Sequence, residues 1–119
     1  MKAIQAADRG GYEALRLVDI PQPQHRAGHA LVRVTSAGVT PLDRTVLAGL
    51  HPRAKKPPLV PGNEGAGVVI EDPSARFTAT ERVLFFAGPG GVTQDGTFAE
   101  ITSVPSGNLA ALPIGIPMT

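Results

Sequence analysis

The stretch L-V-P-G-N-E-G-A-G-V-V-I-E, from Leu59 to Glu71, carries the strongest structural signals in the chain. A Pro–Gly corner at positions 61–62 places the polar side chains of Asn63 and Glu64 at the entrance to a strand. Glycines at positions 65 and 67 leave room for a backbone or a ligand to approach, and the β-branched run behind them predicts a buried strand. Two interpretations stay open: the floor of a pocket, or glycines that only fit a tight β corner.

The glycines of this stretch do not form a dinucleotide fingerprint. The motif G-x-G-x-x-G follows a strand and opens a helix, whereas these glycines have a different order and precede strand-like residues. The later segment Ala87–Gly91 is also rich in glycine but lacks the Lys-Ser/Thr pair of a phosphate loop. We therefore predict a flexible connecting loop there and no phosphate cradle.

The composition predicts one small β-rich domain. Fourteen Gly and twelve Pro among 119 residues leave little room for long helices, and 42% hydrophobic but only 4% aromatic residues predict an aliphatic core. Eleven basic and ten acidic residues give a net charge of +1, which makes nucleic acid and anionic membranes poor candidate partners. The chain has no cysteine, no apolar leader and no long apolar run, so we expect a soluble cytoplasmic protein.

Hydrophobic alternation predicts about seven short strands joined by Gly- and Pro-rich turns. The clearest is 29–37, with Leu31 and Arg33 on one face and Val32 and Val34 on the other. A Gly-Gly pair predicts a hairpin between strands at 2–7 and 12–20, with Leu17 pointing inward. Further strands are expected at 68–70, 82–86, 96–101 and from 109 onward. The pattern predicts an all-β fold, a partly open β-barrel with one or two short helices.

One short helix is predicted after the strand at 29–37. Thr40 is a suitable N-cap, Pro41 occupies the favoured first position, and Asp43 stands where a capping box has Glu or Gln. Leu42, Val46 and Leu47 give one buried stripe, and Gly49 is expected to end the helix.

Three places carry polar side chains that could bind or react, and each has a structural alternative. Thr40 and Asp43 lie one helical turn apart, so they either cap the helix or present a hydroxyl and a carboxylate to a ligand. Asn63 and Glu64 either fix a turn or line a pocket, and His51 is either a solvated loop residue or a hydrogen-bond donor. No Ser or Thr has a His at an interpretable spacing, so no nucleophile–base pair is predicted.

Five motifs, in this order and spacing, resemble the quinone oxidoreductase (zeta-crystallin-like) branch of the medium-chain dehydrogenase/reductase superfamily. They are S-A-G-V-T-P-L-D-R (36–44), V-P-G-N-E-G-A-G-V-V (60–69), E-R-V (81–83), D-G-T-F-A-E (95–100) and L-P-x-G (112–115). The similarity covers residues 1–119 and corresponds to the family's GroES-like N-terminal domain. We expect the family's Rossmann cofactor domain to begin after Thr119 and so to be absent from this chain.

The resemblance implies hydride transfer from NADPH to a quinone, or to a conjugated enone or enal, in a cleft between two domains. Zinc-dependent relatives carry a Cys where this chain has Thr40 and a His where it has Asn63, so the resemblance implies no metal site. A quinone or enone accepts hydride at carbon while its oxygen needs only a hydrogen-bond donor, which removes the need for a Lewis acid.

The resemblance also assigns roles to residues. It implies that Thr40 and Asp43 bind the nicotinamide side of the cofactor and that Thr45, His51 and Asn63 face the substrate. Thr40 or His51 is expected to orient the substrate carbonyl, and Glu64 to pair with an arginine.

On this interpretation the isolated chain is inactive and binds NADPH weakly or not at all. The alternatives are a free-standing GroES-like interaction module or a degraded, inactive gene product. A homo-oligomer formed through the apolar face that a missing domain would leave is a further possibility.

Overall fold

Seven strands and one α-helix make up the regular structure of residues 1–86 and 88–117, the part of the chain that the computed structural model describes. The strands are β1 (Lys2–Ala6), β2 (Leu15–Asp19), β3 (His29–Ala37), β4 (Gly65–Glu71), β5 (Arg82–Phe85), β6 (Ile101–Pro105) and β7 (Leu109–Ala111), and helix α1 spans Pro41–Leu47. Short 3-10 turns at Tyr12–Ala14 and Ser106–Asn108 precede β2 and β7. The predicted all-β class is confirmed.

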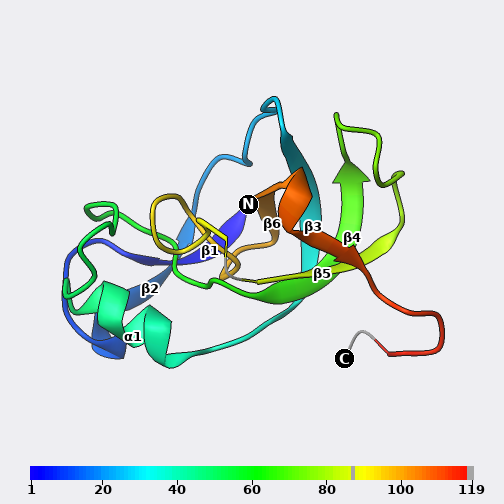
Figure 1. Cartoon of the computed structure of the whole chain (residues 1–119). Helices are drawn as coiled ribbons and strands as arrows, with labels where there is room; N and C mark the ends of the chain where they lie inside the picture. The colour runs from blue at the N-terminus through cyan, green and yellow to red at the C-terminus, as the bar shows by residue number, and fades with distance from the viewer. Residues whose placement is uncertain (87, 118–119) are drawn as a thin grey trace.

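The strands form a curled, partly open barrel (Figure 1). Five of them make an antiparallel sheet in the order β6-β3-β4-β5-β7, and β1 and β2 form a separate hairpin. Isolated bridges from Ala3 to Ala99 and from Ala6 to Leu59 attach the hairpin to the rest of the chain. This is the GroES-like half-barrel that the motifs predict, with α1 at the end of the molecule that holds the hairpin turn.

The glycines of β4 are required by the backbone of β3. A Cβ atom on Gly67 would lie 2.2 Å from the carbonyl oxygen of Arg33, and one on Gly65 would lie 2.7 Å from that of Ser36. The register places Gly67 opposite Val34 beside a bulge, where the two strands approach closely. This close approach supports the tight β corner for Gly65 and Gly67, while Gly65 also lines an open hollow with Ser36 and Phe86.

Two apolar clusters stabilise the fold. The larger fills the inner face of the sheet and consists of Ala30, Val32, Val69, Phe77, Val83, Phe85, Val104 and Leu109. The smaller packs Val46 of α1 on Leu59 and Val92, with Leu42 partly buried beside it. The buried stripe of the helix is thus confirmed, and Gly49, with φ +77°, ends the helix in the left-handed conformation that glycine permits. The helix in the described chain is too short to cross a membrane.

Two details of the predicted strands are wrong. Leu17 is 67% exposed, because β2 pairs only with β1 and no other strand covers its outer side. The strand expected at 96–101 begins only at Ile101, because the amides of residues 96–98 pair with residues 60–62 and residues 98–100 meet β1 only through an isolated bridge. There the Thr97 amide donates to Gly62 and the Phe98 amide donates to Pro61, at 3.0 and 3.1 Å. Residues 87 and 118–119, which belong to the predicted loop and to the chain end, lie outside the described residues.

Candidate functional site at the start of helix α1

The carboxylate of Asp43 joins the start of α1 to the Pro–Gly corner. Its Oδ2 accepts the backbone N–H of Thr40 at 2.8 Å, and its Oδ1 accepts the backbone N–H of Gly62 at 3.1 Å. Asp43 is only 1% exposed, and two backbone donors satisfy a charge that burial would otherwise penalise. The predicted capping role of Asp43 is confirmed, and the same carboxylate brings the two sequence-distant candidate regions together.

The corner itself has a backbone that only glycine adopts easily. Gly62 has φ +102°, and a Cβ atom there would lie 2.1 Å from the Thr97 hydroxyl oxygen. That hydroxyl donates to the carbonyl of Glu64 at 3.2 Å, so the segment around Thr97 holds the corner from the other side. Asn63 therefore follows a corner that is tied both to α1 and to the segment before β6.

Asn63 anchors the glycine-rich segment after β5. Its amide group donates to the carbonyl oxygens of Gly88 and Gly90, at 2.7 and 2.9 Å. Both amide hydrogens are thereby used, and the segment is held against the corner. Sequence reasoning assigned Asn63 to the substrate and missed this contact; a glycine-rich segment whose carbonyls need donors was the only available signal. Phe86, 62% exposed, lines the same small hollow as Asn63.

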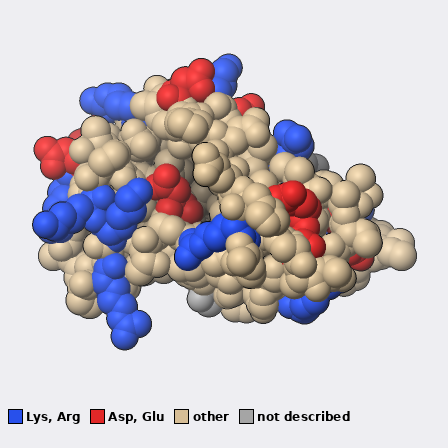
Figure 2. Space-filling view, turned by 90° about the horizontal axis from the view of Figure 1, so that it is seen from above, with Lys and Arg blue, Asp and Glu red and all other residues tan. Residues whose placement is uncertain are grey.

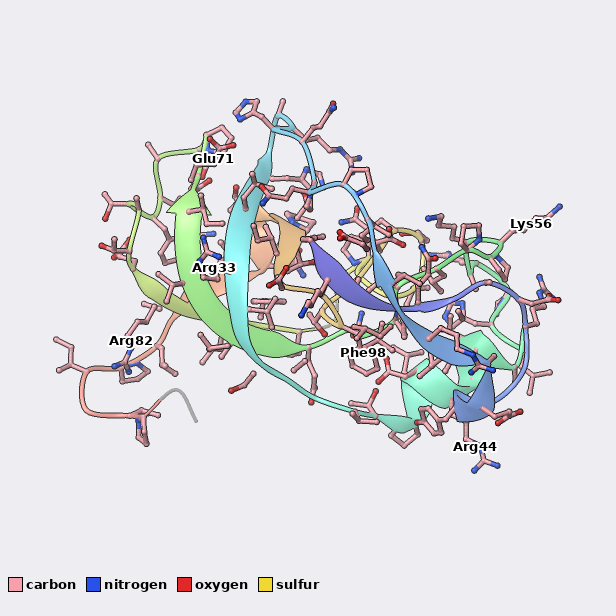
Figure 3. All side chains as sticks on the ribbon, turned by 180° about the vertical axis from the view of Figure 1, so that it is seen from behind. Arg33, Arg44, Lys56, Glu71, Arg82 and Phe98 are labelled. Atoms are coloured by element: carbon pink, nitrogen blue, oxygen red, sulfur yellow. The ribbon has the colours of Figure 1, made fainter. Side chains whose placement is uncertain are left out.

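Thr45 and His51 lie toward the other end of α1. The Thr45 hydroxyl donates to the carbonyl of Pro41 at 3.1 Å within the helix. Nδ1 of His51 accepts the backbone N–H of Arg53 at 3.1 Å, so a neutral His51 carries its proton on Nε2. Helix α1 has seven residues and is about 10 Å long, and His51 follows its C-terminal end. At this end, Arg44 and Lys56 point away from the body of the molecule (Figure 3).

Glu64 does not have the predicted arginine partner. It is exposed and appears in none of the ion pairs of the described residues, which join Met1 to Asp19, His25 to Glu71 and Lys55 to Asp95. Its side chain lies over Gly38, where a Cβ atom would come within 2.3 Å of Oε1. Close contact with the glycine replaces the expected ion pair.

The donor set at the start of α1 is a poor match for a transition metal. No group of three or more His, Cys, Asp or Glu side chains that could hold a metal ion occurs among the described residues. The candidate site offers a hydroxyl, an amide whose nitrogen faces two carbonyls, and a buried carboxylate already bonded to two N–H groups. Zinc prefers thiolate and imidazole ligands, which are missing from these positions.

Comparison with known proteins identifies the family. The model of the alcohol dehydrogenase GroES-like domain matches residues 26–114, which is most of the chain. The chain therefore belongs to the alcohol dehydrogenase GroES-like domain family, within the medium-chain dehydrogenase/reductase superfamily, and quinone oxidoreductases are among its relatives.

The relatives are much longer than this chain. The quinone oxidoreductase of Rattus norvegicus is 29% identical over 109 residues, covering 88% of this chain and 33% of the rat protein. The solved structure of a probable oxidoreductase from Mycobacterium abscessus is 32% identical with a TM-score of 0.87, covering 99% of this chain and 37% of that one. The quinone oxidoreductase from Thermus thermophilus, also solved in complex with NADPH, is 32% identical with a TM-score of 0.77, covering 99% and 34%. The chain thus spans about a third of the length of these relatives.

Proposed function

We propose that this chain is the substrate-side domain of an NADPH-dependent, zinc-independent quinone or enone reductase. The observation that carries the proposal is the Asp43 carboxylate, which fixes the start of α1 beside the Gly62 corner in a member of an oxidoreductase family. Such a rigid polar corner suits a site that must hold a planar acceptor in one orientation.

Thr40 is the proposed donor to the oxygen of the acceptor. Its backbone is fixed by the bond to Asp43, while its hydroxyl lies 3.5 Å from the same carboxylate, at the limit of a hydrogen bond. A weakly held hydroxyl on a fixed backbone can turn to a ligand at little cost. Asp43 then acts as a positioning residue, and Asn63 shapes the wall of the site by holding Gly88 and Gly90.

His51 and Thr45 have a separate proposed role. The Thr45 hydroxyl bonds to Pro41 and the His51 ring to Arg53, so neither is tied to the corner that Asp43 supports. His51, with Nε2 as donor, is proposed to bind a polar group on the far side of the acceptor, and Thr45 to line the surface between them. Acceptors with a second polar group, such as quinones, fit this arrangement better than simple enones.

The proposed cofactor fits this chain only at its nicotinamide end. Helix α1 has seven residues and its first turn already receives the Asp43 carboxylate, so it offers no seat for a pyrophosphate. When bound, NADPH supplies the hydride; Thr40 and the Asp43-supported corner would hold the nicotinamide side, while its phosphates must be bound outside these residues. The donor set described above favours a reaction without zinc.

A chimeric enzyme tests the proposal directly. We would replace the matching third of the Thermus thermophilus quinone oxidoreductase with this chain and measure NADPH oxidation by a quinone and by an enone. We expect turnover in the chimera and none in the isolated chain. Thr40→Val should lower kcat/KM about tenfold to a hundredfold, and His51→Phe should raise KM more than it lowers kcat. A chimera that folds and binds NADPH but reduces neither acceptor would contradict the proposal and favour an interaction module.

A further inference from the structure

A groove separate from the candidate site lies between the β2–β3 connection and the segment around β6. Its volume is about 410 Å³, within the usual range of small-molecule sites. One wall is the connection at residues 20–26, which Pro21 and Pro23 hold extended, and the other is residues 94–96 and 99–103. Ile20, Pro23 and Ala99, which are partly exposed, contribute apolar surface to the groove. The groove is lined by none of the candidate residues at α1 or the Asn63 corner.

A hydrogen-bonded chain crosses from one wall to the other. The Arg26 guanidinium donates to Oε1 of Gln94 at 3.2 Å, and Nε2 of Gln94 donates to the carbonyl of Ser103 at 2.8 Å. The connection at 20–28 forms the strap at the top of Figure 1. Figure 2 looks down on this side, where acidic and basic side chains stand beside a central hollow.

Ser103 carries an unusual group beside this groove. Its hydroxyl oxygen is shielded from solvent and is the single buried side-chain polar atom without a hydrogen-bond partner among the described residues. A buried hydroxyl without a partner destabilises the folded chain. Because this oxygen has no exposed surface, a ligand in the groove does not bond to it.

The charges around the groove favour an anion. Asp95 is neutralised, because its Oδ1 accepts the ammonium group of Lys55 at 3.3 Å and the amide of Val60 at 2.9 Å. Nδ1 of His25 lies 2.8 Å from the carboxylate of Glu71. Arg26 forms no ion pair among the described residues, and its bond to Gln94 uses one of five guanidinium donors. The groove therefore combines an apolar surface with an uncompensated cation at its mouth.

We propose that this groove binds a small amphipathic carboxylate. The carboxylate pairs with Arg26, and the apolar body lies on the partly exposed side chains of Ile20, Pro23 and Ala99. The site is independent of the proposed reductase function, because it needs neither a cofactor nor Thr40.

The test is an amide chemical-shift titration of the 119-residue chain with phenylacetate, with 2-phenylethanol as the neutral analogue and acetate as the anion without an apolar body. We expect shifts confined to residues 20–26 and 94–103, with phenylacetate binding about tenfold more tightly than either control. Arg26→Gln should weaken phenylacetate binding about tenfold, whereas Arg33→Gln, on the outer face of β3 (Figure 3), should not change it.

Ser103→Ala separates binding from structure. The variant should bind phenylacetate as the unchanged chain does, while its thermal midpoint stays the same or rises, because it removes an unpartnered buried hydroxyl that the ligand does not reach. The proposal is overturned if phenylacetate causes no shifts at millimolar concentration, if its shifts map to Thr40 and Asn63, or if acetate binds equally well. Equal binding by the Arg26→Gln variant would also overturn it.

Discussion

Removal of the Asp43 carboxylate should destabilise the whole domain. In Asp43→Ala, the backbone N–H groups of Thr40 and Gly62 lose their acceptor at a position that is 1% exposed. Each unsatisfied buried donor costs about 1–3 kcal/mol, so the free energy of unfolding should fall by about 3 kcal/mol. For a domain of this size, that corresponds to a thermal midpoint lower by roughly 10 °C. Asp43→Asn retains one acceptor and should lose about 2 kcal/mol.

Urea titration followed by circular dichroism measures these differences, with Asp8→Ala as the control. Asp8 is exposed and its carboxylate accepts only the amide of its neighbour Arg9, so its loss should change the free energy of unfolding by less than about 0.5 kcal/mol. If Asp43→Ala loses less than about 1 kcal/mol, the carboxylate is not the link between α1 and the corner. The site would then need another explanation for its geometry.

Three further outcomes follow from the structure. Gly67→Ala should strongly destabilise or unfold the chain, because its Cβ would meet the Arg33 carbonyl at 2.2 Å. The control Gly107→Ala, with open space around the new Cβ, should fold normally. Soluble yield and thermal midpoint distinguish the two variants. Burial opposes ionisation of Asp72, but hydrogen bonds from Ser106, Ser74 and Phe77 outweigh it and lower the pKa to about 2. The folded pKa of Asp72 is below the ordinary value, so the stability that its carboxylate contributes is present above about pH 4 and is lost toward pH 2. After solvent screening, this contribution to the free energy of unfolding is at most about 1 kcal/mol. Asp72→Asn should remove that part of the pH dependence of urea unfolding. Asn63→Ala should increase hydrogen exchange at residues 88–91 while leaving β3 and β4 protected, because the anchors to Gly88 and Gly90 are lost.

The sequence predicted those features whose causes lie within a few residues. The cap at Thr40 and Asp43 and the glycine that ends α1 are set by neighbours along the chain, so local chemistry was sufficient. The alternation of β3 was equally readable, because one of its faces is buried. The sequence also placed the turn before Gly65 correctly. The reason for glycine at positions 65 and 67 became clear only from the position of the partner strand β3.

Features that depend on distant partners were predicted less well. The segment at 96–100 reads as a strand, but the amides of residues 96–98 pair with residues 60–62 and the amide of Glu100 pairs with Lys2, all far away in the sequence. For Asn63 the sequence left a turn-fixing role and a pocket role open, and it did not indicate that the amide bonds to carbonyls 25 and 27 residues later. Nothing in the sequence indicates that Arg26, Gln94 and Ser103 share one groove, because that groove exists only once β6 has paired with β3.

The same limit applies to the list of candidate site residues. Motif matching treats Thr40, Asp43, Thr45, His51 and Asn63 as one set, but the structure divides them. The Asp43 bonds join the helix start to the corner beside Asn63, whereas His51 follows the far end of the helix. Thr40 and His51 are proposed to bind different polar groups of an acceptor, so substitutions at these two residues should affect different parts of it. Measuring kcat and KM of the two variants with a quinone and with a simple enone therefore tests whether Thr40 and His51 bind different parts of the acceptor.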